Sequence, residues 1–127
     1  MEDVKTNLAV LWIIRGLAFL CDGLLVLYEP GGIDQMLTGE LYGMQLGDEL
    51  SLMLVFMLVV SLIMALLSLN MKGSVNKWAN ILVGLVLIVV GIALNLSMGA
   101  TSIAHYVVQG LQYVFTALII WFAWKIK

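Results

Sequence analysis

The sequence predicts an all-α protein, a four-helix bundle embedded in a membrane. Hydrophobic residues make up 63% of the 127 residues and charged residues only 11%, whereas about a quarter of the residues in a soluble domain are charged. Each of four apolar stretches is close to the about 20 residues that a helix needs to cross the hydrocarbon of a bilayer. These predicted spans cover about 8–28, 50–69, 77–96 and 103–124. The remainder is too short for a soluble domain, so residues 1–127 are expected to form a single integral membrane domain.

The first predicted span carries two ionisable side chains, Arg15 and Asp22. Seven residues of helix turn by about 700°, close to two full turns, so both side chains lie on one face, about 10 Å apart along the axis. A charge at that depth costs about 2.5–3.5 kcal/mol on insertion scales if it stays unpaired. This face therefore indicates a polar interior. The same span contains the single cysteine, Cys21, which we expect to be buried and inert.

The segment of about 29–49 is the one long connection, and its Pro30-Gly31-Gly32 sequence ends the first helix. A repeat at helical spacing follows, formed by Ile33, Met36, Leu37 and Leu41. It predicts a short helix that lies at the membrane surface. Asp48-Glu49 opens the second span, where acidic side chains stabilise the positive end of the helix dipole. We interpret this pair as capping residues rather than as a cation site.

The later spans each place small or polar residues on one helical face. The second span offers only Ser61, Ala65 and Ser68, and we interpret it as a scaffold helix. A stripe along the third span, at i, i+4, i+11 and i+15, consists of Asn80, Gly84, Gly91 and Asn95. Because glycine permits close approach and an amide in lipid needs a partner, this stripe predicts contact with another helix. The polar face of the fourth span consists of His105, Gln109, Gln112 and Thr116.

Spans that alternate in direction bring the polar faces of the first and fourth spans to the same levels. At about 1.5 Å per residue from the cytoplasmic end, Asp22 lies about 21 Å deep and Gln109 about 22 Å deep. Gln112 falls between the levels of Arg15 and Asp22 and is predicted to bridge them. The predicted polar network, which is also the candidate binding site, consists of Arg15, Asp22, His105, Gln109, Gln112 and Thr116.

Two interpretations fit this network. In the structural one, Arg15 and Asp22 neutralise each other through Gln112, and the amides set the register of the helices. In the functional one, Asp22 binds a proton or a cation, and Arg15 either anchors an anionic ligand or adjusts how tightly Asp22 holds a proton. His105 is expected at a helix interface and not at a metal, because no second His or Cys stands at ligand spacing.

The basic residues outside or at the edges of the predicted spans share one side of the chain, whereas the long connection on the other side carries only acidic charges. The basic residues, all on one side of a four-span chain, are Lys5, Lys72, Lys77, Lys125 and Lys127. The long connection carries Glu29, Asp34, Glu40, Asp48 and Glu49, with no Lys or Arg. Since cytoplasmic loops carry the excess of Lys and Arg, both termini are expected in the cytoplasm of a multi-pass protein of the cell membrane.

Several chemistries have no support in the sequence. It contains no Gly-rich phosphate loop, no HExxH, no GxSxG and no basic patch of the nucleic-acid-binding type. One His, one Cys and one Arg leave few groups for catalysis. We therefore expect no enzyme activity, no metal, no cofactor and no nucleic-acid partner.

Three short stretches carry a resemblance to a known group of proteins. They are Asn76-Lys77-Trp78-Ala79-Asn80-Ile81, Trp121-Phe122-Ala123-Trp124-Lys125 at the end of the last span, and Tyr28-x-Pro30-Gly31 after the first. In these stretches the chain resembles small four-span prokaryotic membrane proteins of unknown function. The resemblance implies four helices and implies no catalytic role.

Two classes of function follow from these observations. In the first, the protein acts by helix association, as a homo-oligomer or as an accessory subunit of a membrane complex, with its glycine and serine faces supplying the contacts. In the second, it is a minimal transporter or channel subunit that uses Asp22 as a proton-binding or cation-binding carboxylate. The expected partners are accordingly the lipid bilayer and other copies or subunits.

Overall fold

The structure is a computed structural model that describes residues 2–25, 27–28, 30–41, 44–45, 47–97 and 103–126. Within these residues the long helices are α1 (Glu2–Leu25), α3 (Asp48–Asn70), α4 (Gly73–Ser97) and α5 (Ile103–Trp124). Between α1 and α3 lie the short helix α2 (Gly32–Leu37) and two strands, β1 (Glu40–Leu41) and β2 (Met44–Gln45). The predicted all-α class is confirmed, with these two-residue strands as the exception.

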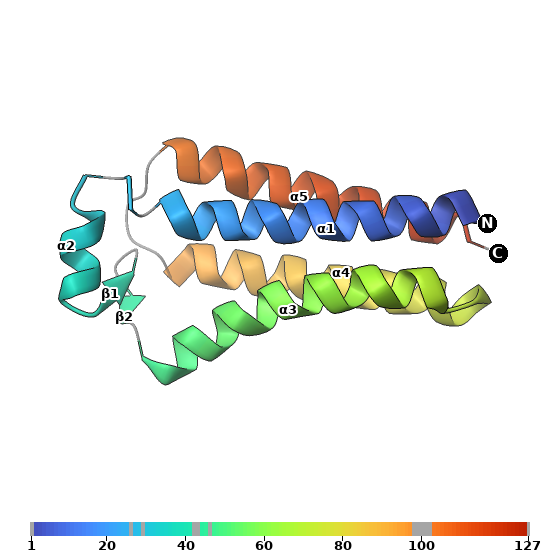
Figure 1. The fold of residues 1–127 in the computed structure, drawn as a ribbon, viewed down its shortest axis with the longest axis horizontal. Coiled ribbons are helices and arrows are strands. Elements are labelled where there is room, and N and C mark those ends of the chain that lie inside the picture. Colours follow the sequence, from blue (N-terminus) through green and yellow to red (C-terminus); the bar gives the residue numbers. More distant parts are fainter. Residues whose placement is uncertain are drawn as a thin grey trace.

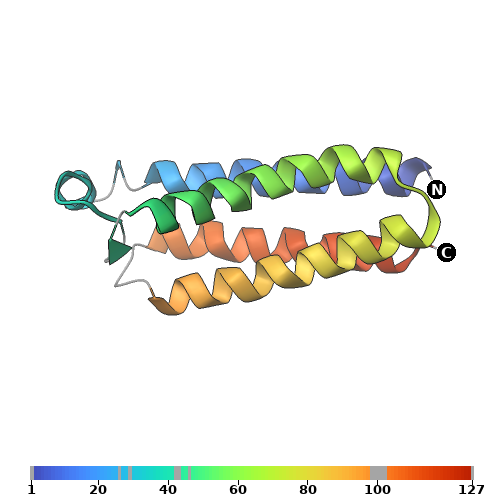
Figure 2. The same ribbon diagram turned by 90° about the horizontal axis from the view of Figure 1, so that it is seen from below.

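The four long helices run in alternating directions and form a bundle (Figures 1 and 2). Helix α1 packs against both α3 and α5, and α4 packs mainly against α5. Both chain ends lie at one end of the bundle, which we call the termini end. The opposite end, which carries α2 and the two strands, is called the α2 end. An even number of long helices places the two chain ends together.

The exterior of the bundle is apolar and its interior holds polar groups. All four long helices are long and apolar enough to cross a membrane, as judged by length and composition. Large side chains such as Leu17, Leu66 and Val89 are about three-fifths exposed, whereas Arg15 and Asp22 are buried. This distribution is the reverse of that in a water-soluble protein, where charged side chains are rarely buried.

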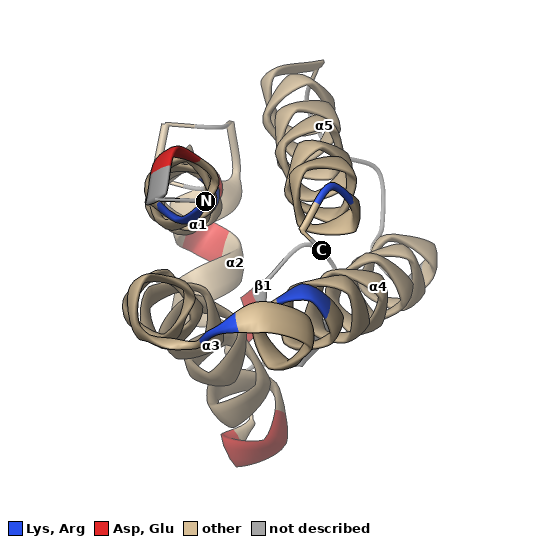
Figure 3. Cartoon of the chain, turned by 90° about the vertical axis from the view of Figure 1, so that its right-hand side faces the viewer, with Lys and Arg blue, Asp and Glu red and all other residues tan. Residues whose placement is uncertain are grey.

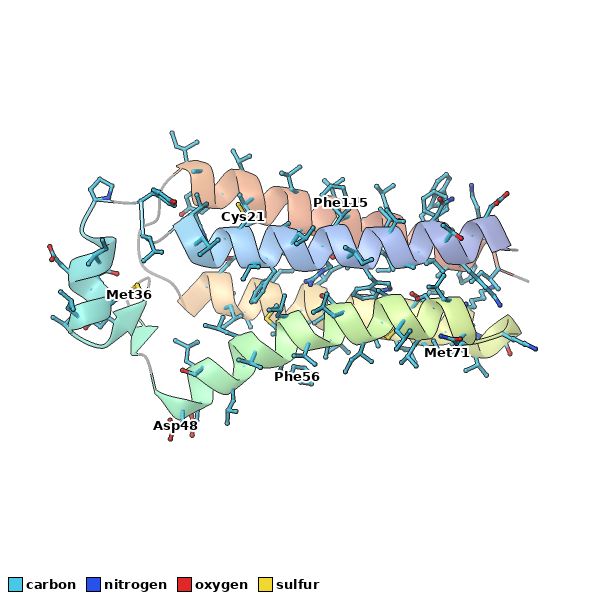
Figure 4. The ribbon with its side chains drawn as sticks, viewed as in Figure 1. Cys21, Met36, Asp48, Phe56, Met71 and Phe115 are labelled. Atoms are coloured by element: carbon cyan, nitrogen blue, oxygen red, sulfur yellow. The ribbon has the colours of Figure 1, made fainter. Side chains whose placement is uncertain are left out.

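Helix α3 diverges from the bundle toward the α2 end. Its first residue, Asp48, lies well away from α1 and α4 (Figures 1 and 4). The turn between α3 and α4 keeps the two helices together at the termini end, where Gly73 adopts a positive φ of 58° that favours glycine. The divergence means that the four helices cannot close on each other at the α2 end. The space it leaves contains the candidate site described below.

The connection from α1 to α3 differs in part from the prediction. A short helix does form, but it ends at Leu37, and Leu41 belongs to β1. Thr38 closes the helix because its backbone N–H and its hydroxyl both donate to carbonyl oxygens of the last turn, and Gly39 follows with a φ of 84°. The strands pair in antiparallel fashion, with Leu41 opposite Met44.

The charged residues at the two ends of the bundle differ in sign, except that Glu2 and Asp3 begin α1 at the termini end, which faces the viewer in Figure 3. The described lysines lie at the termini end, and the acids of the connection lie at the α2 end. Two lysines rest on indole rings: Lys77 Nζ is 4.5 Å from the centre of the Trp124 ring and Lys125 Nζ is 3.5 Å from that of Trp121. Such pairs suit a boundary between apolar and aqueous surroundings, because the indole is amphipathic and the ammonium prefers water. Glu29 and Lys127 lie outside the described residues.

Candidate functional site

A cavity of about 250 Å³ lies between the four long helices, in the half of the bundle nearer the α2 end. Most of its wall is apolar, with leucines from α1, α3 and α4. Its polar lining residues are Arg15 and Asp22 from α1 and Gln109, Gln112 and Tyr113 from α5. The divergence of α3 creates this space. The cavity thus unites four residues of the predicted network with one, Tyr113, that the sequence analysis did not single out.

Arg15 is held in place by two hydroxyl groups. Its Nε donates to Thr116 Oγ1 at 2.7 Å, and its Nη1 donates to Ser61 Oγ at 3.0 Å. Both hydroxyls donate their own hydrogen to a backbone carbonyl one turn earlier in their helix, so their lone pairs are available to the guanidinium. Arg15 is only 3% exposed, and no acidic side chain among the described residues lies within ion-pair distance of it. Its positive charge is therefore buried without a carboxylate beside it.

Asp22 has partners on α5. Its Oδ1 lies 2.5 Å from His105 Nδ1, and its Oδ2 accepts a hydrogen bond from Gln109 Nε2 at 2.8 Å. The chain of contacts continues to α4, because Asn95 Nδ2 donates to the hydroxyl of Tyr113 at 2.7 Å and lies 3.4 Å from Gln109 Oε1. Carboxylate, imidazole and amides thus tie α1, α4 and α5 together at the α2 end.

The predicted bridge through Gln112 is wrong. Gln112 is 3% exposed, and its Nε2 has no hydrogen-bond partner among the described residues. Arg15 donates to Ser61 and Thr116 instead, because α3 presents a serine at its level, a contact that the interpretation of α3 as scaffold overlooked. A buried amide without a partner costs about 1–3 kcal/mol. Such a group in a cavity wall is suited to meet a ligand or water.

A second polar cluster lies at the termini end and consists of Trp12, Ser68, Asn76 and Asn80, all of them 0% exposed. Trp12 Nε1 donates to Asn80 Oδ1 at 2.7 Å, and Ser68 Oγ donates to the same oxygen at 3.0 Å. The Asn80 amide donates to Asn76 Oδ1 at 2.6 Å, and the Asn76 amide donates to backbone carbonyls of Ser68 and Met71. This cluster joins α1, α3 and α4, and we call it the indole–amide cluster.

The residues of the stripe predicted on the third span lie in two different environments. Asn80 belongs to the indole–amide cluster, whereas Gly84, Gly91 and Asn95 face α5. A Cβ atom on Gly84 would lie 3.0 Å from Ile120 Cγ1, and one on Gly91 would lie 3.2 Å from the Tyr113 hydroxyl. The close approach that these glycines permit is therefore used within the chain. The division arises because Asn80 lies at the level where α1 and α3 both approach α4.

Cys21 does not have the buried position expected for it. Its side chain is exposed, on the outer side of the helix pair α1 and α5 (Figure 4). The reason is the helical rotation of about 100° per residue, which turns Cys21 away from the interior when Asp22 faces it. No group of three or more His, Cys, Asp or Glu side chains able to hold a metal occurs in the described part of the chain.

One known protein family matches the chain over its whole length. The chain belongs to a family of unknown function, DUF6326, which it matches over residues 1–127. No curated protein and no solved structure matches it. The family membership agrees with the resemblance to small proteins of unknown function that the sequence indicated.

Proposed function

We propose that the four long helices cross a cell membrane and that the protein is a minimal transporter subunit that binds a small molecule in the cavity between them. The observation that supports this most is the cavity itself, which holds buried Arg15, buried Asp22 and Gln112, whose Nε2 has no hydrogen-bond partner among the described residues. A charged side chain at the centre of a bilayer costs about 2.5–3.5 kcal/mol on insertion scales. A purely structural core would have little reason to keep such charges beside a cavity.

Asp22 is the proposed proton-binding group of this transporter. Its carboxylate contacts His105, and His is the side chain whose ordinary titration range is closest to neutral pH. His105 lies near the start of α5 at the α2 end, so the pair is the part of the network nearest to that end. We propose that protons reach Asp22 through His105 from the side of the membrane that holds α2.

Labelling with a hydrophobic carbodiimide tests this role, because the reagent modifies protonated carboxyl groups in apolar surroundings. We expect labelling of Asp22 that falls as the pH rises and that disappears in Asp22→Asn. Asp34→Asn is the matched control, since Asp34 lies on exposed α2 outside the cavity. A proton-flux assay in liposomes with the same variants measures the function itself. Equal flux through native protein and Asp22→Asn would contradict the proposal.

The proposed orientation places both termini and the lysines in the cytoplasm and α2 outside. It is supported by the position of the described lysines, which lie at the termini end, opposite α2. A reporter that is active only in the cytosol should be active when fused at either terminus. Activity of a periplasm-specific reporter fused after the last residue would reverse this orientation.

A second candidate function is association with another membrane protein or with a second copy of the chain. It is favoured by an apolar groove of about 210 Å³ between α3 and α4, lined by Phe56, Val60, Leu82, Val83, Val86 and Leu87. Phe56 projects from α3 on the side away from α1 (Figure 4). The glycines expected to supply intersubunit contacts, Gly84 and Gly91, face α5 of the same chain, which weakens this candidate. The mass of the protein in detergent, measured by light scattering, would support it if it is a multiple of the chain mass.

A further inference from the structure

We propose that the cavity binds an amphipathic anion, a molecule with a carboxylate or phosphate head group on an apolar chain. The head group would contact Arg15, Gln112 and Tyr113, and the chain would leave the bundle between α1 and α3. This inference rests on the proposed function in that the cavity is the binding site. It adds the chemical class of the ligand and the route by which it enters.

The polar lining of the cavity offers more hydrogen-bond donors than acceptors. Arg15 has five N–H donors, of which one on Nε and one on Nη1 bond to protein hydroxyls. Gln112 Nε2 has no acceptor among the described residues. The Tyr113 hydroxyl accepts from Asn95 and so keeps its own hydrogen to donate. Three donors of this kind around one apolar space suit a head group with several acceptor oxygens.

The charges in the cavity favour an anion over a cation. Asp22, the one acidic residue among the described lining residues, already contacts His105 and Gln109 with its two oxygens. Within the described residues, the hydrogen-bond acceptors of Arg15 are two neutral hydroxyls. Its position two helical turns from Asp22, about 10 Å along the axis, leaves a separate site for a negative charge. An incoming carboxylate would therefore find a cation without having to displace another carboxylate.

The size and position of the cavity require a ligand with a tail. The volume of about 250 Å³ is below the about 300–1,000 Å³ of pockets that enclose a drug-sized ligand, so it suits a head group and the first few carbons of a chain. The wall between α1 and α3 contains Leu24, which is 51% exposed, and Val55, which is 58% exposed. These side chains belong both to the cavity lining and to the apolar exterior. A longer chain would continue past them into the lipid.

Gly23 marks this opening. It lines the cavity on α1, and a Cβ atom built on it would meet no other atom within 4 Å. A larger side chain at this position can therefore fill the opening without displacing another part of the bundle. Gly110 on α5 offers the matched control, since a Cβ there also meets nothing within 4 Å and Gly110 does not line the cavity.

The test is equilibrium binding to the full chain in micelles of a nonionic sugar-based detergent, which contains no phosphate or carboxylate, with empty micelles as the reference. The probes share a twelve-carbon chain and differ in head group: dodecanoate, dodecyl phosphate, dodecanol and dodecylammonium. We expect both anions to bind at least about tenfold more tightly than the alcohol, the size of one charge-assisted hydrogen bond. Dodecylammonium should not bind above the reference. Tighter binding of dodecanoate identifies free carboxylates as the source of ligand, and tighter binding of dodecyl phosphate identifies phosphate lipids.

Variants locate the site. Arg15→Gln should weaken binding of dodecanoate by about tenfold or more, because the amide keeps hydrogen-bonding capacity but loses the charge. Gly23→Leu should weaken it strongly by filling the opening, whereas Gly110→Leu should leave it unchanged. Gly23→Leu keeps the proposal testable if Arg15→Gln does not fold. Equal affinities for dodecanoate and dodecanol, or an unchanged affinity in Gly23→Leu, would overturn the proposal.

The outcome is separable from that of the proposed transport function. Binding is measured without a pH gradient, and proton flux is measured with one. Dodecanoate binding that depends on Arg15, without any proton flux, supports the ligand assignment and contradicts the transporter. Proton flux that depends on Asp22, without binding of any anionic probe, contradicts the ligand assignment alone.

Discussion

The two buried polar clusters of this protein are built from similar residues but differ in how completely their hydrogen bonds are made. In the indole–amide cluster, Asn80 bonds with Trp12, Ser68 and Asn76. In the cavity, Gln112 is buried to the same degree and its amide nitrogen has no partner among the described residues. The first cluster lies where three helices meet closely, and the second lies where α3 has diverged. A satisfied cluster serves the fold, and an unsatisfied one is available to a ligand.

The largest effect is expected when the satisfied cluster is broken. Asn80→Leu should lower the free energy of unfolding by about 3 kcal/mol, because it leaves the Trp12 indole N–H and the Asn76 side chain without their partner. Unfolding in detergent, followed by circular dichroism, measures the change. Asn70→Leu is the control: its amide bonds to the carbonyl of Leu66 at an exposed site, and its loss should cost within about 0.5 kcal/mol. If the free energy of unfolding falls equally in the two variants, the indole–amide cluster contributes no more to stability than an exposed hydrogen bond does.

Double-mutant cycles test whether the cavity holds one charge network or two. Asp22 and His105 are in contact, so Asp22→Asn and His105→Gln should show a coupling of about 1–2 kcal/mol in the free energy of unfolding. Arg15 and Asp22 have different partners, so Arg15→Gln and Asp22→Asn should be additive within about 0.5 kcal/mol. Strong coupling in the second cycle would restore the single network that the sequence predicts.

The same amide-to-leucine change should have the opposite sign in the cavity. Gln112→Leu removes a buried donor that has no partner in the described part of the chain, so the free energy of unfolding should stay the same or rise by about 1 kcal/mol. Binding of the anionic probes should weaken in the same variant. The comparison with Asn80→Leu in one detergent measures directly how the two clusters differ. A loss of stability as large as that of Asn80→Leu would show that Gln112 has a structural partner.

The smallest effect concerns packing along the glycines. Gly23→Ala should raise the free energy of unfolding by about 0.5 kcal/mol, because alanine is the better helix former and its Cβ meets nothing within 4 Å. Gly84→Ala should lower it, since its Cβ would lie 3.0 Å from Ile120 Cγ1. Thermal unfolding of both variants measures whether the free energy of unfolding rises in the first and falls in the second. A lower free energy of unfolding in Gly23→Ala would indicate that the wall of the cavity is closed at this position.

The length and composition of the chain were enough to predict its helices and the inward face of the first one. Apolar stretches of membrane-spanning length require helices whose backbone groups bond internally. The spacing of Arg15 and Asp22 requires that both face one way. The rise per residue in antiparallel helices places Asp22 and Gln109 at the same depth. The two side chains are hydrogen-bonded in the structure. These features depend on distances along one helix, which the sequence contains.

Only the tertiary structure decided which partner each polar side chain has. Arg15 donates to Ser61 because of the way α3 rotates and tilts against α1, and the same tilt opens the cavity around Gln112. Asn80 separates from Gly84 and Gly91 because different helices approach α4 at different heights. Periodicity fixes which residues share a face. The rotation of one helix relative to another, its tilt and the choice of rotamer depend on packing among all four helices, and these decide which donors find an acceptor.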